Sequence, residues 1–429
     1  MTQSKRFKAI SIIFAAIFLS VSLFAQNENG YVLIQQKCTP CHLKSDIAPY
    51  DFSKVDVIQQ NAKTILYSIE HNYMPLWFAN PTVRHFYGER VLSETEKTII
   101  INWVENLEAD AKQPEPYIDS NLEQNVNQDR KSNLSASSAN TYNFENLSDK
   151  VFINFSELTQ TLPSYISGAT LSFSDKKIVH HAVVYGLDSA SKNYRIAKNA
   201  PSSNLQVNGM GDVNLGVYAP GLNYSLLPDG FGYKSSATKG LLIEKHLLKL
   251  SDETKITTTA NFYYCDNINV REVKSLNLTN LNNNFPIEPN TVKTYHGKAQ
   301  LQDSISLLAV MPHFHKIAIH FYAFAVSPKS DTIPLLELKK WSFDWQTIYR
   351  LNTLLLLPKN TLIYYEVTYD NTAANPANPS NPPEMVWVNK GWSTKNEMMV
   401  FGLQYTAYKN GDETQKLNWV DLDANEVIE

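Results

Sequence analysis

The chain has 429 residues, a net charge of −4 and three cysteines. At about 100–200 residues per domain, this length predicts about two to four domains. The charge offers no basic surface of the kind that binds nucleic acid. The 23 tyrosines and 19 phenylalanines fit pleated, half-buried strands, so the composition favours β structure.

Residues 1–25 have the pattern of a signal peptide. Three basic residues precede an apolar body at 9–24, and Ala25 is a small residue at which cleavage can occur. A membrane anchor is the alternative, but the body is shorter than the ~20 residues that span a bilayer. We therefore expect a periplasmic or secreted bacterial protein with no stable membrane span after signal cleavage.

Cys38, Cys41 and His42 form a C-x-x-C-H motif, the attachment signature of a c-type haem. Each thiol can bond one vinyl group, and His42 can then reach the iron from one side. A redox or zinc C-x-x-C is the alternative, but the chain has no second cysteine pair. We therefore expect one covalent haem c. Cys265 is then the one remaining cysteine, so the rest of the chain is disulfide-poor.

The second axial ligand of the iron should be a soft donor downstream of the motif. Met74, in the run Met-Pro-Leu-Trp, is the predicted ligand. His71 is the competitor, and a methionine that only packs in the core is the other alternative. A methionine ligand would raise the reduction potential of the haem and favour electron transfer.

A helix closes this segment. Ser93 and Glu96 match a capping box, and apolar residues then recur at helical spacing as far as Leu107. The C-x-x-C-H helix, the Met-Pro-x-Trp loop and this last helix together resemble the small bacterial cytochrome c module. The resemblance implies a small all-α cytochrome c domain over residues 28–110.

Residues 111–145 are poor in apolar side chains and rich in Ser, Asn, Gln and Asp. Such a stretch buries too little surface to offset the entropy of ordering it. We predict a flexible linker that would keep the haem domain at high effective concentration near the rest of the chain.

The chain from residue 146 onward consists of short apolar-alternating runs separated by Gly, Pro, Asn and Asp. Evenly spaced short strands of this kind predict sandwiches or barrels. The remaining length suggests two such domains in series. The clearest runs are 177–185, 254–264, 317–325 and 362–369.

Two pairs of histidines in this region are candidate metal ligands, and the spacing of the second pair along the chain is the more indicative. His313 and His315 are two apart, so on a strand they share a face and can chelate one ion. His180 and His181 are adjacent and would point to opposite faces unless the strand ends or bulges there. An ordinary hydrogen-bonded histidine is the alternative for either pair. The region holds His180, His181, His246, His296, His313, His315 and His320.

An ordered set of motifs resembles the copper type II, ascorbate-dependent monooxygenases, which include the peptidylglycine and dopamine β-monooxygenases. Bacterial members with an N-terminal cytochrome c domain look closest. The resemblance covers most of residues 150–410 and implies two jelly-roll-like β-sandwich domains, at 146–290 and 291–425. The motifs are IVHHAVVYG, YAPG with LLPDG, MPHFHK, WSFDWQTIY, LLPKNT, NPANPSNPP and GWSTKNEMM.

The resemblance implies two copper ions, each held by three side chains. His180, His181 and His246 map onto the electron-transfer copper, although His246 lies in Glu-Lys-His-Leu where the family usually has Gln-x-His-Tyr. The second set, His313, His315 and Met398, maps onto the copper that binds oxygen. Imidazole suits both oxidation states of copper, and a thioether favours Cu(I).

Three histidine and methionine positions complete the list of candidates. Met399 competes with Met398, but the family's Glu-Met step fits Met398 better. His296 and His320 are expected to bind no metal, since His320 lies an odd number of residues from His315 and would face away on a regular strand.

The resemblance implies an exported haem- and copper-dependent monooxygenase that hydroxylates a C–H bond with O2. Electrons would reach the oxygen-binding copper from the c-type haem and the other copper. The expected partners are a small-molecule or peptide substrate and a redox donor, either ascorbate or a periplasmic electron carrier. No motif identifies the substrate.

Two non-catalytic functions remain open from the sequence. The chain could be a periplasmic electron-transfer or copper-binding protein if the first copper is missing. It could also be a β-sandwich binding module that delivers substrate to another redox protein, with which the Asn- and Pro-rich loop at 371–383 is compatible.

Overall fold

The computed structural model describes ten ranges of the chain. The predicted signal peptide and residues 108–131 of the predicted haem domain and linker lie outside them. No helix within the described ranges is both long and apolar enough to cross a membrane. The ranges are 30–42, 48–107, 132–143, 149–199, 211–219, 225–248, 253–265, 269–279, 284–389 and 394–422.

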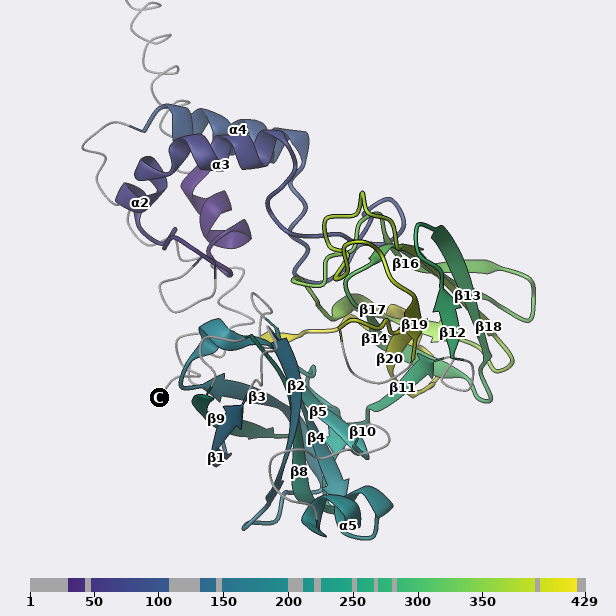
Figure 1. The fold of residues 1–429 in the computed structure, drawn as a ribbon. Coiled ribbons are helices and arrows are strands. Elements are labelled where there is room, and N and C mark those ends of the chain that lie inside the picture. The colour runs from purple at the N-terminus through teal and green to yellow at the C-terminus, as the bar shows by residue number, and fades with distance from the viewer. Residues whose placement is uncertain are drawn as a thin grey trace, which may run out of the picture. The chain divides into compact units, whose positions relative to one another are not determined.

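The described residues are mostly β, with several antiparallel sheets in sandwich-like groups and a few helices near the N-terminus (Figure 1). This order, helices first and β structure after, is the one that the sequence predicts. The chain divides into two compact units. The helical unit holds the described residues up to Trp77 and those from Arg90 to 107. The β unit holds Phe78–Glu89 and the described residues from 132 onward.

The helical unit has a core of apolar side chains from four short helices. Its helices are residues 30–37, α2 (Val55–Gln60), α3 (Ala62–Glu70) and α4 (Glu94–Glu105). Ile34, Ile58, Ile100 and Trp103 are almost fully buried in this core. Gly30 is required by close approach, because a Cβ there would lie 2.2 Å from Cβ of Trp103.

The predicted capping box at the start of α4 is confirmed. The amide of Glu96 donates to Oγ of Ser93 at 3.2 Å, and the amide of Ser93 donates to the Glu96 carboxylate at 2.7 Å. Two amides of the first turn that have no partner within the helix are therefore satisfied by side chains.

The first group of strands lies between residues 134 and 272. It forms two main sheets, of strand order β1-β9-β3-β7-β10 and β2-β8-β4-β5. The helix α5 (Lys192–Asn199) packs against the second sheet through Tyr194 and Ala197. The strands are β1 (Leu134–Asn143), β2 (Asp149–Glu157), β3 (Tyr165–Phe173), β4 (Val179–Asp188), β5 (Val213–Tyr218), β7 (Phe231–Lys234), β8 (Thr238–Leu248), β9 (Glu253–Tyr264) and β10 (Arg271–Glu272), with a short 3₁₀ helix η1 at Lys176–Ile178.

Strand β1 corrects the predicted linker of 111–145. Residues 134–143 pair with β9 in unbroken antiparallel register, from Leu134 opposite Phe262 to Asn143 opposite Glu253. Alternate side chains are half-buried, but most of them are small or polar, as Ala136 and Ser138 are. A strand that buries so little apolar surface has a linker-like composition, which is why the sequence pattern missed it.

The second group of strands follows from residue 274. Its main sheets have the orders β13-β18-β15-β16 and β11-β20-β14-β17, with a small sheet β12-β19. Burial alternates along β18, so one face of its sheet lies on the core. The strands are β11 (Lys274–Thr279), β12 (Phe285–Ile287), β13 (Val292–Gln300), β14 (Ile305–His313), β15 (Ala318–Val326), β16 (Thr332–Leu338), β17 (Tyr349–Leu357), β18 (Leu362–Asp370), β19 (Val386–Val388) and β20 (Val400–Ala407), with a 3₁₀ helix η2 at Asp412–Thr414.

The division between the two groups differs from the expected boundary at residue 290. Strands β11 and β12 precede that boundary, yet they pair with β20 and β19 of the second group. Near the other end of the chain, β21 (Val420–Asp421) pairs with β6 (Ser225–Leu226) of the first group. Periodicity identifies a strand but not its partner, so the sequence could not place this division.

Residues Phe78–Glu89, here called the strap, belong to the β unit although they fall inside the expected domain 28–110. Ala79 bridges Leu338 on β16. Arg84 donates to the carbonyl of Pro334 at 2.7 Å, and the amide of Tyr87 donates to the carbonyl of Arg350 at 2.7 Å. These bonds run along two strands of the second group, so the expected haem domain is interrupted at the strap.

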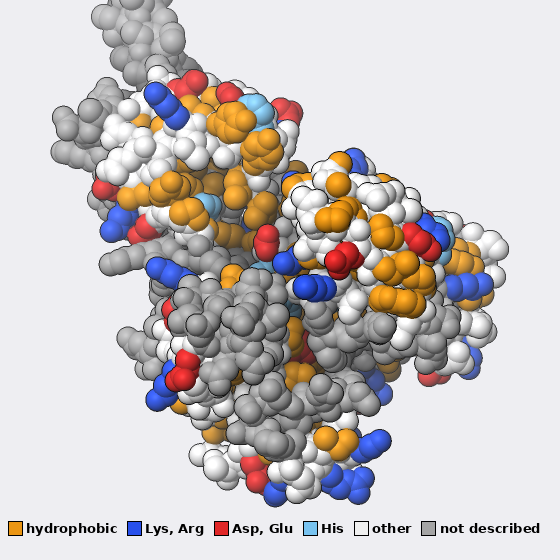
Figure 2. Space-filling model, in the orientation of Figure 1, with side chains coloured by type: hydrophobic (Ala, Val, Ile, Leu, Met, Phe, Trp, Pro, Cys, Tyr) orange, Lys and Arg blue, Asp and Glu red, His pale blue; other side chains and the backbone are white. Residues whose placement is uncertain are grey.

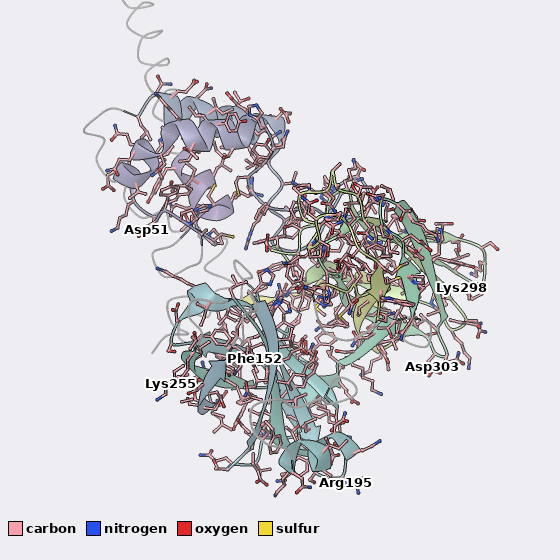
Figure 3. The ribbon with its side chains drawn as sticks, viewed as in Figure 1. Asp51, Phe152, Arg195, Lys255, Lys298 and Asp303 are labelled. Carbon is pink, nitrogen blue, oxygen red and sulfur yellow. The ribbon has the colours of Figure 1, made fainter. Side chains whose placement is uncertain are left out.

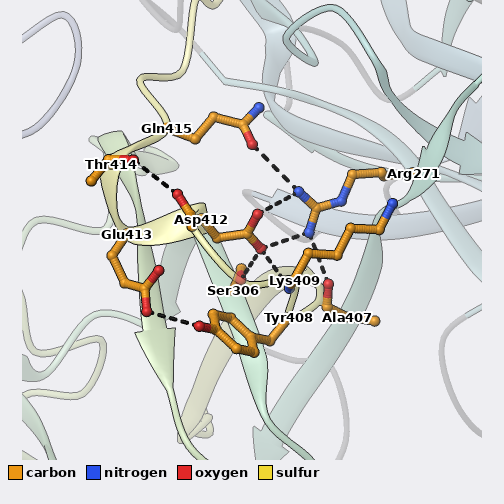
Figure 4. A network of polar contacts seen from close by, with 10 residues as sticks. Arg271, Ser306, Ala407, Tyr408, Lys409, Asp412, Glu413, Thr414 and Gln415 are labelled. Carbon is orange, nitrogen blue, oxygen red and sulfur yellow. Dashed lines mark hydrogen bonds and ion pairs between the residues drawn. The ribbon is translucent and has the colours of Figure 1, made fainter.

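A buried ion pair joins the two groups of strands (Figure 4). Arg271 of β10 donates to both carboxylate oxygens of Asp412 in η2, at 2.8 and 2.7 Å. Ser306 and the amide of Lys409 also donate to this carboxylate. Burial alone would raise the pKa of Asp412, but these donors outweigh it and lower the pKa to about 2.

Candidate metal centre

Three histidines meet on the sheet β2-β8-β4-β5. His181 of β4 lies directly opposite His246 of β8, and the register shifts by one residue between Val179 and His181. His180 is therefore the extra residue of a β-bulge, which turns its side chain toward its neighbour's. His180 and His181 could share a metal only if the strand ended or bulged there, and the bulge is present. His246, the third residue that the resemblance implied, completes the group.

The first cluster, His180, His181 and His246, could hold a metal ion such as copper. One ligand atom from each ring lies within 4.8 Å of the others, and all three residues are buried. Nδ1 of His180 and Nδ1 of His181 are 3.0 Å apart. Two nitrogens that each lie ~2 Å from one ion are about 3 Å from each other, so this spacing suits a shared metal.

The surroundings of His181 and His180 also suit metal binding. Burial lowers the pKa of His181 well below its usual value, and the neighbouring histidines lower it further. Nε2 of His180 donates to Oδ1 of Asp344 at 3.1 Å, which directs its Nδ1 toward the cluster. An imidazole whose other nitrogen donates to a carboxylate is a common arrangement for a metal-binding histidine.

His313 and His315 form a second cluster, where β14 ends. His313 is the last residue of β14, and its ring lies 5.5 Å from that of His315, centre to centre. Nδ1 of His313 contacts Oε1 of Gln346 at 2.7 Å, and Nδ1 of His315 donates to the carbonyl of Asn396 at 2.8 Å. Burial lowers the pKa of His313 to about 4. Nε2 is thus the nitrogen that each ring would offer to a metal.

The structure brings the segment of Met398 beside this pair. The Glu397 carboxylate accepts hydrogen bonds from the amides of His315 and Ile317, at 2.7 and 2.8 Å. Met398 is buried, and its carbonyl accepts from the Tyr369 hydroxyl at 2.7 Å. Met399 is buried on the same segment. That Met398 supplies the sulfur ligand stays a prediction.

The two clusters adjoin each other. The rings of His181 and His313 are 5.8 Å apart, little more than the 5.1 Å between His181 and His246 within the first cluster. The ring of Phe343 stacks on His180 at 4.5 Å and also contacts His315 at 5.7 Å. Five histidines and one phenylalanine therefore form a continuous aromatic group.

The C-x-x-C-H segment has a histidine in an orientation that suits haem iron. Nδ1 of His42 donates to the carbonyl of Pro49 at 2.7 Å, so Nε2 is the nitrogen that an iron would use. Cys38 and Cys41, like Cys265, lie in the described ranges and form no disulfide. Burial and the neighbouring Cys41 raise the pKa of Cys38 to about 12. Nη1 of Arg90 donates to Sγ of Cys41 at 3.1 Å, and attachment of a haem to these two thiols stays a prediction.

Exposed large apolar side chains are concentrated in the helical unit. Seven large apolar side chains are exposed among the described residues, and four of them belong to this unit: Tyr50, Tyr67, Tyr73 and Met74. Figure 2 shows hydrophobic side chains gathered over the face of this unit that is in view. The competing His71 donates to the carbonyl of Tyr67 and stacks on its ring at 4.0 Å. Met74 as the axial ligand stays a prediction.

The two histidines that were expected to bind no metal each contact a carboxylate. His320 lies 3.4 Å from Glu337, and His296 lies 3.4 Å from Glu366. Four residues around the five histidines had no role assigned from the sequence: Phe343, Asp344, Gln346 and Glu397. The first three lie in the aromatic run WSFDWQ, where the polar residues Asp344 and Gln346 are the signal that could have identified this segment.

Comparisons with known proteins identify no family for this chain. No family model matches it, and no curated protein matches it. The infectious bursal disease virus VP2 subviral particle is 11% identical over 66% of this chain and 74% of that chain, with a TM-score of 0.19. The Gt strain of the same virus is 10% identical over 68% of this chain and 78% of that chain, also with a TM-score of 0.19. Scores this low carry no argument about fold or function.

Proposed function

We propose that this protein is an exported haem- and copper-dependent monooxygenase that hydroxylates a C–H bond with O2. In this proposal it is a copper type II monooxygenase with a cytochrome c domain and two jelly-roll-like sandwiches. The observation that carries the proposal is the meeting of His180, His181 and His246 with His313 and His315. These residues come from strands far apart in the sequence, and the segment of Met398 lies beside them.

The donor sets suit copper at both clusters. Three imidazoles would hold one ion at the first cluster, and His313, His315 and Met398 would hold another at the second. Copper bound there would supply one-electron redox chemistry and a position for O2. Burial lowers the pKa of His181 and of His313. Hydrogen bonds orient His180, His313 and His315. A soft thioether from Met398 would favour the reduced ion.

Residues of the helical unit would hold a covalent haem, which would supply electron transfer. Cys38 and Cys41 would bond its vinyl groups, and His42 and Met74 would bind its iron. The donor to the haem would be ascorbate or a periplasmic electron carrier. The substrate would be a small molecule or a peptide.

Copper content and oxygen consumption test this proposal. We expect two copper ions per chain, and O2 uptake with ascorbate in the presence of one member of a panel of peptide and small-molecule C–H substrates. Met398→Ala should abolish that uptake while the haem absorbance stays unchanged. Undiminished hydroxylation in Met398→Ala would show that the second site is wrongly assigned. One or no copper per chain would favour a non-catalytic electron-transfer protein instead.

A further inference from the structure

The segment Trp341–Gln346, here called the clamp, lies between β16 and β17 and contacts both histidine clusters. The indole nitrogen of Trp341 donates to the carbonyl of His315 at 2.8 Å. Phe343 and Asp344 contact His180, and Gln346 contacts His313. We propose that the clamp is a shared positioning element, which fixes one histidine of each cluster and so sets the affinity of each for its metal. This inference rests on the metal binding proposed above.

Asp344 fixes the ring of His180. The carboxylate accepts the Nε2 hydrogen of His180 at 3.1 Å, so Nδ1 is the nitrogen that this ring would offer to a metal. That nitrogen is the one 3.0 Å from Nδ1 of His181, inside the first cluster. The Asp344 side chain is 88% exposed, so its loss leaves the core intact. Its effect should therefore be confined to how His180 presents its nitrogen.

Gln346 fixes the ring of His313 so that the other ring nitrogen, Nε2, is left for a metal. Its amide nitrogen donates to the carbonyl of Phe343 at 3.1 Å, which leaves Oε1 to accept from Nδ1 of His313 at 2.7 Å. The lone pair of His313 is then on Nε2. The clamp thus selects Nδ1 on a histidine of one cluster and Nε2 on a histidine of the other.

Phe343 packs between the Asp344–His180 contact and the Gln346–His313 contact. Its ring is nearly parallel to that of His180, with 14° between the planes, and it contacts His246 at 5.3 Å and His315 at 5.7 Å. A buried phenyl ring among imidazoles offers no ligand, so its contribution is packing. The ring limits rotation of His180 while the polar partners on either side of it set the tautomers.

The test separates the clusters by removing one at a time in the full chain. In a His313→Ala/His315→Ala background, which keeps the first cluster, Asp344→Ala should weaken Cu(I) binding about 10-fold or more in a chelator competition. It should also change the nitrogen hyperfine pattern of Cu(II) in the electron paramagnetic resonance spectrum. In a His180→Ala/His181→Ala background, which keeps the second cluster, Asp344→Ala should change neither the Cu(I) affinity nor the Cu(II) spectrum. In the same background, Gln346→Leu should weaken Cu(I) binding. Gln346→Glu keeps an acceptor for His313 and should leave Cu(I) binding close to that of the background.

Asp303→Asn is the matched control for loss of a carboxylate. Asp303 is exposed in the same group of strands (Figure 3), and its substitution should alter neither affinity nor spectrum. The clamp proposal is overturned if Asp344→Ala behaves like Asp303→Asn, or if its effect is equal in the two backgrounds. Absence of copper binding in the unsubstituted chain would overturn the proposed function as well, so the two failures are distinguishable.

Discussion

The two histidine clusters adjoin each other but obtain their geometry in different ways. The first lies on two paired strands, where the ladder sets His181 opposite His246 and a bulge adds His180. The second begins where β14 ends, so its rings depend on partners outside the ladder, among them Gln346 and the carbonyl of Asn396. The two sites are therefore built differently, and in the proposed function the second is the one that accepts O2.

Removing one ligand from each cluster should give the largest effects and the sharpest contrast. We expect His246→Ala and His315→Ala each to lose one copper per chain and all O2 uptake. Carbon monoxide, which mimics O2, should still bind the reduced His246→Ala protein but not His315→Ala. Infrared spectra of the reduced proteins under carbon monoxide measure this. Equal binding of carbon monoxide by both variants would contradict the proposal that O2 binds at the second cluster.

Breaking the ion pair between the two groups of strands tests how strongly it stabilises their junction. Arg271→Ala leaves the charge of Asp412 buried, with its side chain 5% exposed, so we expect a loss of about 3–5 kcal/mol in the free energy of unfolding. Denaturant titration measures it. Lys274→Ala is the control, because the Lys274–Glu272 pair is more exposed and 4.0 Å long. A loss as small as the control's would mean that the pair does not hold the junction.

The same ion pair predicts a loss of stability in acid. The pKa of Asp412 is lowered from its usual 3.8 to about 2 in the folded protein. Its contribution is therefore fully present above pH 3.8 and is lost as the pH falls from there to about 2. We expect about 2 kcal/mol of stability to disappear over this interval. Asp412→Asn should flatten that part of the unfolding profile, and an unchanged profile would refute the assignment.

Glu397 should matter to the second cluster alone. Glu397→Gln replaces one acceptor oxygen by a donor, so the amide of His315 or of Ile317 loses its partner. We expect a cost of about 1–2 kcal/mol and weaker copper binding at the second cluster, with the first unchanged. Chelator competition in the single-cluster backgrounds measures this, and an equal change at both clusters would count against the separate construction of the two sites.

The smallest effect is expected outside both clusters. His296 has a side chain that is 71% exposed and pairs with Glu366 at the surface. We expect His296→Ala to change the free energy of unfolding by less than about 0.5 kcal/mol and to leave copper content and O2 uptake unaltered. A drop in copper content would place a metal ligand where neither cluster lies.

Local patterns predicted the parts of the fold that depend on neighbours in sequence. The capping box at Ser93 needs only a four-residue motif. The H-x-H pair was expected on one strand, but β14 ends at His313 and His315 lies beyond it. The bulge at His180 could be stated as a condition, because two adjacent histidines cannot otherwise share a face. Each of these features is decided within a few residues.

Features that depend on partners distant in the sequence could not be predicted from it. Strand β1 is stabilised by its register with β9 more than by its own apolar side chains, and β11 pairs with β20 across more than a hundred residues. Asp344 and Gln346 are ordinary polar residues until the fold sets histidines from other strands beside them. Their roles come from contacts, which composition and periodicity do not encode.

The strap has a consequence for how this protein can be divided. Its Phe86 is buried and packs on Tyr349 at 5.3 Å, and its Asn80 bonds the backbone of Glu337. A shortened chain that began at residue 121 would lack both residues and bare an apolar surface along β17. The strap is thus part of the β unit although it precedes the predicted linker, so a cut in that linker would remove packing from the β unit itself.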